Sequence, residues 1–275
     1  MRLKRRSTEA RTDAPRPTGR ATEPPACPPG FVVGPPDFVG VGAQKAGTTW
    51  WFRLIEAHPN VYQDPHQRPE LHYFDRFHEG WLTPADIESY HRLFPRPPGS
   101  ITGEKTPEYL ADHWVPRMLH EAAPDCRIIV LLRDPIERYR SALAHDEQRD
   151  SPRGRRSATD MFNRGFYARQ LERWYGSFAR DRVLVLQYER CVADPAGELA
   201  RTYDFLGLSA HPLPEEELRR PRNRTRSEKA ELPAQRLRLL RDEYERDVRA
   251  LGAIVPDLDV SLWPDFAHLA DGTIG

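Results

Sequence analysis

The turn 42–47, which reads GAQKAG, is the part of the chain best suited to bind an anion. It follows an apolar run at 38–41 and precedes a stretch, opened by Thr48 and Thr49, whose apolar residues have helical spacing. The amides of such a turn and of the helix N-terminus attract phosphate or sulfate groups, and Lys45 adds a full positive charge. The two threonines offer hydroxyl donors and a helix cap. In the common nucleotide-binding loop the lysine follows the last glycine, whereas Lys45 precedes it, and a plain surface turn is the alternative.

A second short loop carries Lys105, within the segment 103–110 that reads GEKTPEYL. Lysine occurs only at positions 4, 45, 105 and 229, and arginine supplies the rest of the 41 basic residues. Two of the four lysines thus lie in short loops flanked by Gly, Thr or Pro, which favours one anion shared by both. A surface role for each lysine is the alternative.

Arg133 follows the apolar run 127–132 (RIIVLL), which is typical of a buried parallel strand. The C-terminal end of such a strand is the usual ligand edge of an open α/β sheet. Asp134 is a suitable helix N-cap, and Glu137 completes a capping-box spacing. Ser141 lies about two helical turns further on, so Arg133 and Ser141 could hold a second phosphate. A salt-bridged arginine and an ordinary helix serine are the alternative.

Glu70 lies within the segment 67–75 (QRPELHYFD), beside apolar and aromatic neighbours. A carboxylate there is either part of a salt bridge or a general base whose proton affinity is raised by partial burial. The residues alone favour the salt bridge.

Segments of strand and helix type alternate along the chain, which predicts an α/β fold with a parallel sheet. Strands are expected at the apolar runs 38–41, 127–132 and 183–186. Helices are expected at 87–94, 112–122 and 194–206, and at a last amphipathic segment that contains Leu237 to Leu251 and stops at Gly252. One further helical face is typical of a core, and it consists of Tyr167, Leu171, Trp174 and Phe178.

The formal charge is zero, from 41 basic and 41 acidic residues, which argues against a nucleic-acid-binding protein. The three cysteines are widely spaced, so neither a zinc site nor a disulfide framework is expected.

Residues 1–36 are rich in Arg, Pro and Thr and are expected to form a disordered basic tail before a single domain at 37–275. Because no signal-peptide pattern and no apolar run of roughly 20 residues is present, a cytoplasmic protein without membrane insertion is expected.

Taken together, these segments resemble the sulfotransferases that use 3′-phosphoadenosine 5′-phosphosulfate (PAPS), above all the heparan-sulfate sulfotransferase-like branch and its bacterial relatives. GAQKAGTTWW resembles the loop for the 5′-phosphosulfate, ELHYFD the motif with the proposed catalytic glutamate, GEKTPEYL the EKTPxY motif, and RIIVLLRDPIERYRSAL the motif that holds the 3′-phosphate. The stretch 165–208 matches the later family pattern of tyrosine, RW, a strand, an E, DP and FLGL. The resemblance covers roughly 38–263 and implies a P-loop-NTPase-like three-layer fold, a central parallel sheet flanked by helices, within a sulfotransferase domain at 37–275.

The resemblance also implies roles for individual residues. Glu70 would take the proton from an acceptor hydroxyl, Lys45 would neutralise the departing oxygen, and Lys105 would face the donor or acceptor near the sulfuryl group. The expected donor-binding residues are Gln44, Lys45, Ala46, Gly47, Thr48, Thr49, Arg133, Ser141, Tyr188, Arg224 and Thr225. Heparan-type enzymes close a late Lys-Gly loop over the donor, whereas this chain has NRTR at 223–226.

The implied donor is PAPS, no metal is required, and the implied acceptor is a small molecule or glycan, namely a hydroxyl of a carbohydrate, lipid or secondary metabolite. A P-loop kinase or NTPase is one alternative, and a nucleotide-binding scaffold without catalysis is another. The position of Lys45 argues against the first, and the presence of Lys45 together with Glu70 argues against the second. No pattern sets an oligomeric state.

Overall fold

The computed structural model describes residues 24, 26–65, 68, 70–78, 80–147, 157–220 and 231–270. Within these ranges the centre is a sheet of four strands, which are β1 (Phe38–Gly42), β2 (Gly103–Lys105), β3 (Arg127–Leu132) and β4 (Val183–Gln187). All are parallel, in the order β2-β1-β3-β4. Nearly every strand residue is buried, because helices cover both faces, and this explains the continuous apolar runs.

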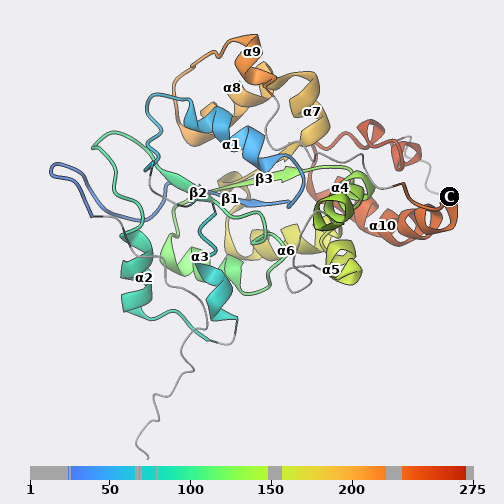
Figure 1. Ribbon diagram of the computed structural model, residues 1–275, viewed down its shortest axis with the longest axis horizontal. Coiled ribbons are helices and arrows are strands. Elements are labelled where there is room, and N and C mark those ends of the chain that lie inside the picture. The colour runs from blue at the N-terminus through green and yellow to red at the C-terminus, as the bar shows by residue number, and fades with distance from the viewer. Residues whose placement is uncertain are drawn as a thin grey trace, which may run out of the picture.

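Figure 1 shows the sheet between two layers of helices, with α1 and α8 on one face and α3 and α6 on the other. The predicted α/β class and its three layers are therefore confirmed. The helices are α1 (Thr48–Glu56), α2 (Pro84–His91), α3 (Val115–Ala122), α4 (Pro135–Glu147), α5 (Ala158–Asn163), α6 (Tyr167–Ser177), α7 (Tyr188–Ala193), α8 (Pro195–Leu206), α9 (Glu215–Leu218) and α10 (Ala234–Ile254). Short 3-10 turns are η1 (Phe74–Phe77), η3 (Arg180–Arg182), η4 (Val260–Leu262) and η5 (Ala267–Leu269). No helix in these described ranges has the length and apolar content that a membrane span requires.

Local signals set some helix ends and not others. Asp194 accepts the backbone N–H of Gly197 at 2.9 Å, and Gly207 ends α8 with a φ of 71°, as predicted. In contrast, α10 does not stop at Gly252 but continues to Ile254. A glycine within a helix costs about 1 kcal/mol relative to alanine, and burial of Leu251 on the core offsets that cost. Helix α2 spans Pro84–His91 rather than 87–94, because Thr83 caps it and Pro84 takes its first position. Helix α3 begins at Val115 rather than at 112.

The folded unit begins before the predicted boundary at residue 37. Val32 and Arg96 exchange two backbone hydrogen bonds, of 2.9 and 3.0 Å. The ring of Phe31 lies edge-on to that of Tyr62, with centroids 5.3 Å apart. Residues from 31 onward therefore pack on the domain, whereas the predicted disorder of the preceding tail stays a prediction because residues 1–23 and 25 lie outside the described ranges.

Candidate active site

The turn after β1 approaches the end of β3 and enters α1 through a left-handed glycine. Ala43 donates its N–H to the carbonyl of Leu131 at 2.7 Å, which ties the turn to the C-terminal end of β3. Gly47 is the N-cap of α1 with φ of 90°, and no side chain caps this helix. The expectation that Thr48 or Thr49 caps the helix is therefore wrong, because both lie inside its first turn. Trp50 and Trp51 donate their N–H groups to the carbonyl of Gly47, at 3.0 and 3.2 Å. The amides of Thr48 and Thr49 lack intrahelical acceptors by helix geometry, which suits them to bind an anion.

Tyr188 and Arg133 close around this turn. A Cβ at Gly47 would lie 2.8 Å from the ring of Tyr188, so a glycine is required there. The guanidinium of Arg133 lies 4.8 Å from the centroid of the same ring and donates to the carbonyl of Lys45 at 3.3 Å. Glu137 holds Arg133 from the other side, with 3.6 Å between their charged groups. The structure thus brings together four predicted donor-binding residues from three separate segments.

The structure also describes Gln44 and Ala46 in the turn and Ser141 on α4. Gln44 donates from Nε2 to Oε1 of Glu108 at 2.6 Å, so its side chain ties the turn to the segment after β2. Ala46 is fully buried, and Ser141 is buried on α4, the helix that follows Arg133. Arg224 and Thr225 lie outside the described residues.

The cap at the start of α4 is as predicted. Asp134 is the cap, since its Oδ1 accepts the N–H groups of Ile136 and Glu137 at 2.8 and 3.2 Å. Glu189, just after β4, accepts the N–H of Asp134 at 3.1 Å. Burial raises the pKa of Asp134 to about 7.

Glu189 is the E of the later family pattern, to which sequence reasoning gave no role. Its second oxygen accepts from the indole N–H of Trp263 at 2.9 Å, so it joins β4, α4 and the C-terminal segment. Its position directly after the apolar strand 183–187, at the ligand edge, was an available signal.

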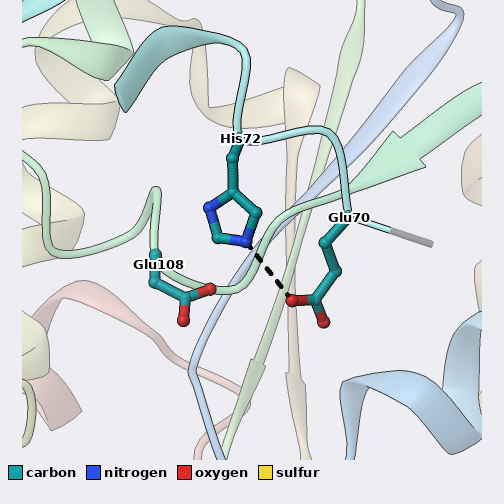
Figure 2. Close-up of side chains that lie close together, drawn as sticks. All are labelled: Glu70, His72 and Glu108. Atoms are coloured by element: carbon teal, nitrogen blue, oxygen red, sulfur yellow. Dashed lines mark ion pairs between the residues drawn. The ribbon is translucent and has the colours of Figure 1, made fainter. Parts of the chain in front are cut away.

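Glu70 lies in a chain of alternating charges, of which Figure 2 shows the ion pair with His72. Lys105 donates to Oε1 of Glu70 at 3.0 Å, and Nε2 of His72 lies 3.5 Å from Oε2. The other ring nitrogen of His72 is 2.8 Å from Oδ2 of Asp75. The hydrogen bond from His72 is the largest effect on Glu70; together with Lys105 it outweighs burial and lowers the pKa of Glu70 to about 2. The salt bridge favoured by the residues is therefore confirmed, and the raised proton affinity is not present in this arrangement.

His72 lies within the ELHYFD motif, but sequence reasoning gave it no role. Its hydrogen bond to Asp75, followed by that to Glu70, raises its pKa to about 10. The backbone holds it in the left-handed region with φ of 52°, and its N–H donates to the hydroxyl of Thr106 at 3.3 Å. His72 and Asp75 stand three residues apart next to Glu70, and this HxxD spacing could have indicated that they pair.

Potential ligand atoms of Glu70, His72 and Glu108 lie within 4.8 Å of one another, a spacing that a metal ion could use (Figure 2). Metal binding requires a neutral imidazole, and the two carboxylates beside His72 favour its protonated form. Lys105 also occupies one oxygen of Glu70. These contacts fit a charge network better than a metal site.

The two lysine loops lie next to each other. Lys105 pairs with Gly40 in the register of β2 and β1, close to the end of β1 where the anion-binding turn begins. A cavity of about 110 Å³ is lined by Lys105 together with Thr49 of α1 and Glu56. Sharing of one anion by Lys45 and Lys105 stays a prediction.

Comparisons with known proteins agree with this geometry. A sequence profile of the sulfotransferase domain matches residues 35–246. Human heparan sulfate glucosamine 3-O-sulfotransferase 6 is 34% identical over 187 residues, which cover 63% of this chain and 52% of that protein. Its mouse counterpart is 34% identical over 221 residues, which cover 71% of this chain and 62% of that protein. The chain thus matches somewhat more than half the length of these relatives.

A solved sulfotransferase from Alicyclobacillus acidocaldarius has the same fold. The two structures superpose with a TM-score of 0.67 at 26% identity, over 84% of this chain and 100% of that one. The profile match extends over more than half of the chain and includes the turn 42–47, Glu70, Lys105 and Arg133. The chain therefore belongs to the sulfotransferase domain family.

Proposed function

We propose that the protein transfers a sulfuryl group from PAPS to a hydroxyl of a carbohydrate, lipid or secondary metabolite. One observation carries this proposal. Lys105 holds the carboxylate of Glu70, and it does so one strand away from the turn at the N-terminus of α1, which contains a lysine and a left-handed glycine. The turn can bind an anionic leaving group, and the carboxylate can accept a proton. These are the two functions that sulfuryl transfer to an alcohol requires.

The residues around the turn fit the donor. Gly47 has no room for a side chain beside Tyr188, so only backbone amides line that point, as the binding of a phosphosulfate requires. Residues 44–49 would hold the 5′-phosphosulfate. Arg133 and Ser141 would hold the 3′-phosphate, and Arg133 is already fixed by Glu137 and by the carbonyl of Lys45. Tyr188 would contact the donor through its ring.

The reaction places opposite demands on the two ends of the site. When bound, the donor supplies a sulfuryl group whose bond to the 5′-phosphate oxygen breaks as the bond to the acceptor oxygen forms. Lys45 would stabilise the negative charge on the departing oxygen. Glu70 would receive the proton of the attacking hydroxyl, and His72, fixed by Asp75, would keep Glu70 oriented toward it.

A carboxylate with a pKa of about 2 is a weak base, and Lys105 offers a way to strengthen it. Its ammonium group lies 3.0 Å from Glu70 in the present arrangement. If Lys105 turns to a sulfuryl oxygen, Glu70 loses one of its two cationic partners and its proton affinity rises. Lys105 would then both hold the transferred group and release the base.

The acceptor class is part of the proposal. The relatives named above act, by their names, on glucosamine of heparan sulfate, and we infer a glycan or small-molecule hydroxyl for this chain. The expected cytoplasmic location and the absence of a metal requirement stay predictions.

The test is calorimetric titration of the full chain with PAP, the desulfated donor, and with ATP plus magnesium as the competing ligand. We expect PAP to bind, and Arg133→Ala to weaken binding by roughly 10- to 100-fold, as the loss of a charge-assisted contact predicts. Arg249→Ala, on the exposed face of α10, is the matched control. Binding of ATP with magnesium and not of PAP would favour an NTPase, and PAP binding without transfer to any acceptor would favour a scaffold.

A further inference from the structure

A cavity of about 390 Å³ lies between the segment 111–114 and the helices α5 and α6. We call it the arginine cavity, and define it by Arg164, Arg169, Arg173, Asp112, Asp160 and Trp114. Its volume is within the range of small-molecule sites, about 300–1,000 Å³. None of the residues assigned above to donor binding or to the role of base lines this cavity.

The arginines of the cavity have more hydrogen-bonding capacity than the described protein groups use. Nε of Arg173 and one terminal nitrogen of Arg164 are buried and have no hydrogen-bond partner among the described residues. The other nitrogens of Arg173 donate to the carbonyls of Arg169 and Ala111, at 3.1 and 3.2 Å, rather than to a carboxylate. Buried donors without acceptors destabilise a protein, so such a site favours a ligand that supplies oxygen atoms.

The charge of the cavity also favours an anion. Three arginines face two aspartates, and Asp160 is already paired with Arg164 at 3.0 Å. Burial, followed by the neighbouring charge of Arg169, lowers the pKa of Arg173 against the opposing effect of Asp112 and Glu172. Arg169 itself is an exposed residue of α6 and can reach a ligand without a change in the core.

Both walls of the cavity lead back to the reaction site. The indole of Trp114 donates to the carbonyl of Phe74 at 3.0 Å, and the next residue is Asp75, the partner of His72. The hydroxyl of Tyr167, at the start of α6, donates to the carbonyl of Arg133 at 2.9 Å. A molecule that occupies the cavity is therefore next to the segments that carry the base and the 3′-phosphate site.

We propose that the arginine cavity is an acceptor subsite that binds a carboxylate carried on a sugar-sized ring. A guanidinium matches a carboxylate with two parallel hydrogen bonds, and Arg169 and Arg173 would provide them. Trp114 offers an apolar surface to the ring. This inference rests on the proposed function, because it assigns the cavity to the acceptor of the same reaction.

The test compares galacturonate with galactose, two rings of the same size that differ in the carboxylate, by saturation-transfer NMR on the full chain. We expect galacturonate to bind and galactose not to bind. Arg169→Gln and Arg173→Gln should each weaken galacturonate binding at least tenfold, and added salt should weaken it in the wild type. Arg249→Gln, the same substitution on α10, should leave it unchanged.

Equal binding of the two sugars, or unchanged galacturonate binding in both cavity variants, would overturn the proposal. So would displacement of galacturonate by an equal concentration of inorganic sulfate, because the site would then bind free anions rather than an acceptor ring. If Arg173→Gln does not fold, Arg169→Gln at its exposed position decides alone. PAP titration of the same variants tests the donor assignment and the acceptor subsite separately. Normal PAP affinity together with lost galacturonate binding would support both proposals. A wild type that binds galacturonate but not PAP would refute the donor assignment alone.

Discussion

At the scale of single residues, the site depends on the order of charges Asp75, His72, Glu70 and Lys105. Each charged group lies within 3.5 Å of a group of opposite sign. Because Glu70 has a cation on each side and His72 has a carboxylate on each side, the network favours the ionised forms of Glu70 and His72. The pKa of Glu70 falls to about 2 and that of His72 rises to about 10 for this reason.

The first prediction concerns the carboxylate of Glu70. Glu70→Gln keeps the shape of the side chain and removes its capacity to accept a proton, so turnover should fall by roughly 10²- to 10⁴-fold. PAP affinity, measured by calorimetry, should be kept. Glu88→Gln, an exposed position on α2, is the control for the substitution itself. The rate is measured as transfer from PAPS to the acceptor that is active in a panel of glycans and alcohols. An unchanged rate would contradict the role of Glu70 as base.

The second prediction concerns the dependence of stability on pH through His72. Its pKa is about 10 in the folded protein, compared with an ordinary value of 6.5. The stabilisation is therefore complete below pH 6.5 and is lost as the pH rises through about 10. After allowance for solvent screening of this partly exposed group, the loss should be roughly 1 kcal/mol. Urea unfolding at pH 6 and pH 10 should show this decrease in the wild type and a smaller one in His72→Asn; equal decreases in the two proteins would contradict it.

At the scale of elements, the junction between β1 and α1 decides whether the donor can bind. The chain needs a left-handed residue at the N-cap, and the neighbouring ring of Tyr188 excludes a side chain there. Arg133 at the end of β3 and Tyr188 at the start of α7 approach this junction because their strands flank each other in the sheet. Parallel pairing thus places three ligand-edge segments side by side.

The third prediction distinguishes the effect of left-handed backbone strain at residue 47 from the effect of its close contact with Tyr188. Gly47→Ala should lower the free energy of unfolding by about 1–3 kcal/mol and should also weaken PAP binding, since the new methyl group lies against Tyr188. Gly99→Ala is the matched control, because φ there is 85° and nothing lies within 4 Å of an added Cβ. It should lose stability without losing PAP affinity. Equal effects of both variants on PAP binding would show that the Tyr188 contact is unimportant.

At the scale of the whole molecule, one core extends across both faces of the sheet. Cys126, next to β3, and Cys191, on α7, are buried in it, whereas Cys27 is exposed near the N-terminal end of the described chain. Burial raises the pKa of both inner thiols, which reduces the thiolate that reacts with alkylating reagents. Their reaction requires the core to open, which is a global or nearly global event.

The fourth prediction follows from that burial. Under native conditions iodoacetamide should label Cys27 only, and in denaturant it should label Cys27, Cys126 and Cys191. Mass spectrometry of peptides from timed samples measures the rates. Labelling of Cys191 as fast as that of Cys27 in the native protein would mean that the layer containing α7 opens locally.

Local pattern was sufficient for several features of this protein. The strands 127–132 and 183–187, the bounds of α8 and the cap at Asp134 depend on residues close to one another in the chain, and all were predictable. The salt-bridged state of Glu70 also agrees with what the residue types favoured.

Tertiary structure decided what depends on partners far away in the chain. Lys105 reaches Glu70 across 35 residues, and Glu189 accepts the N–H of Asp134 at the start of α4 across 55. Gly252 does not end α10, because packing of the flanking residues outweighs a local helix-stop signal. The arginine cavity exists only where the segment 111–114 meets α5 and α6. Helix caps and strand runs arise from bonds within a few residues, whereas proton affinities and cavities depend on which distant groups the packed fold brings within a few ångströms.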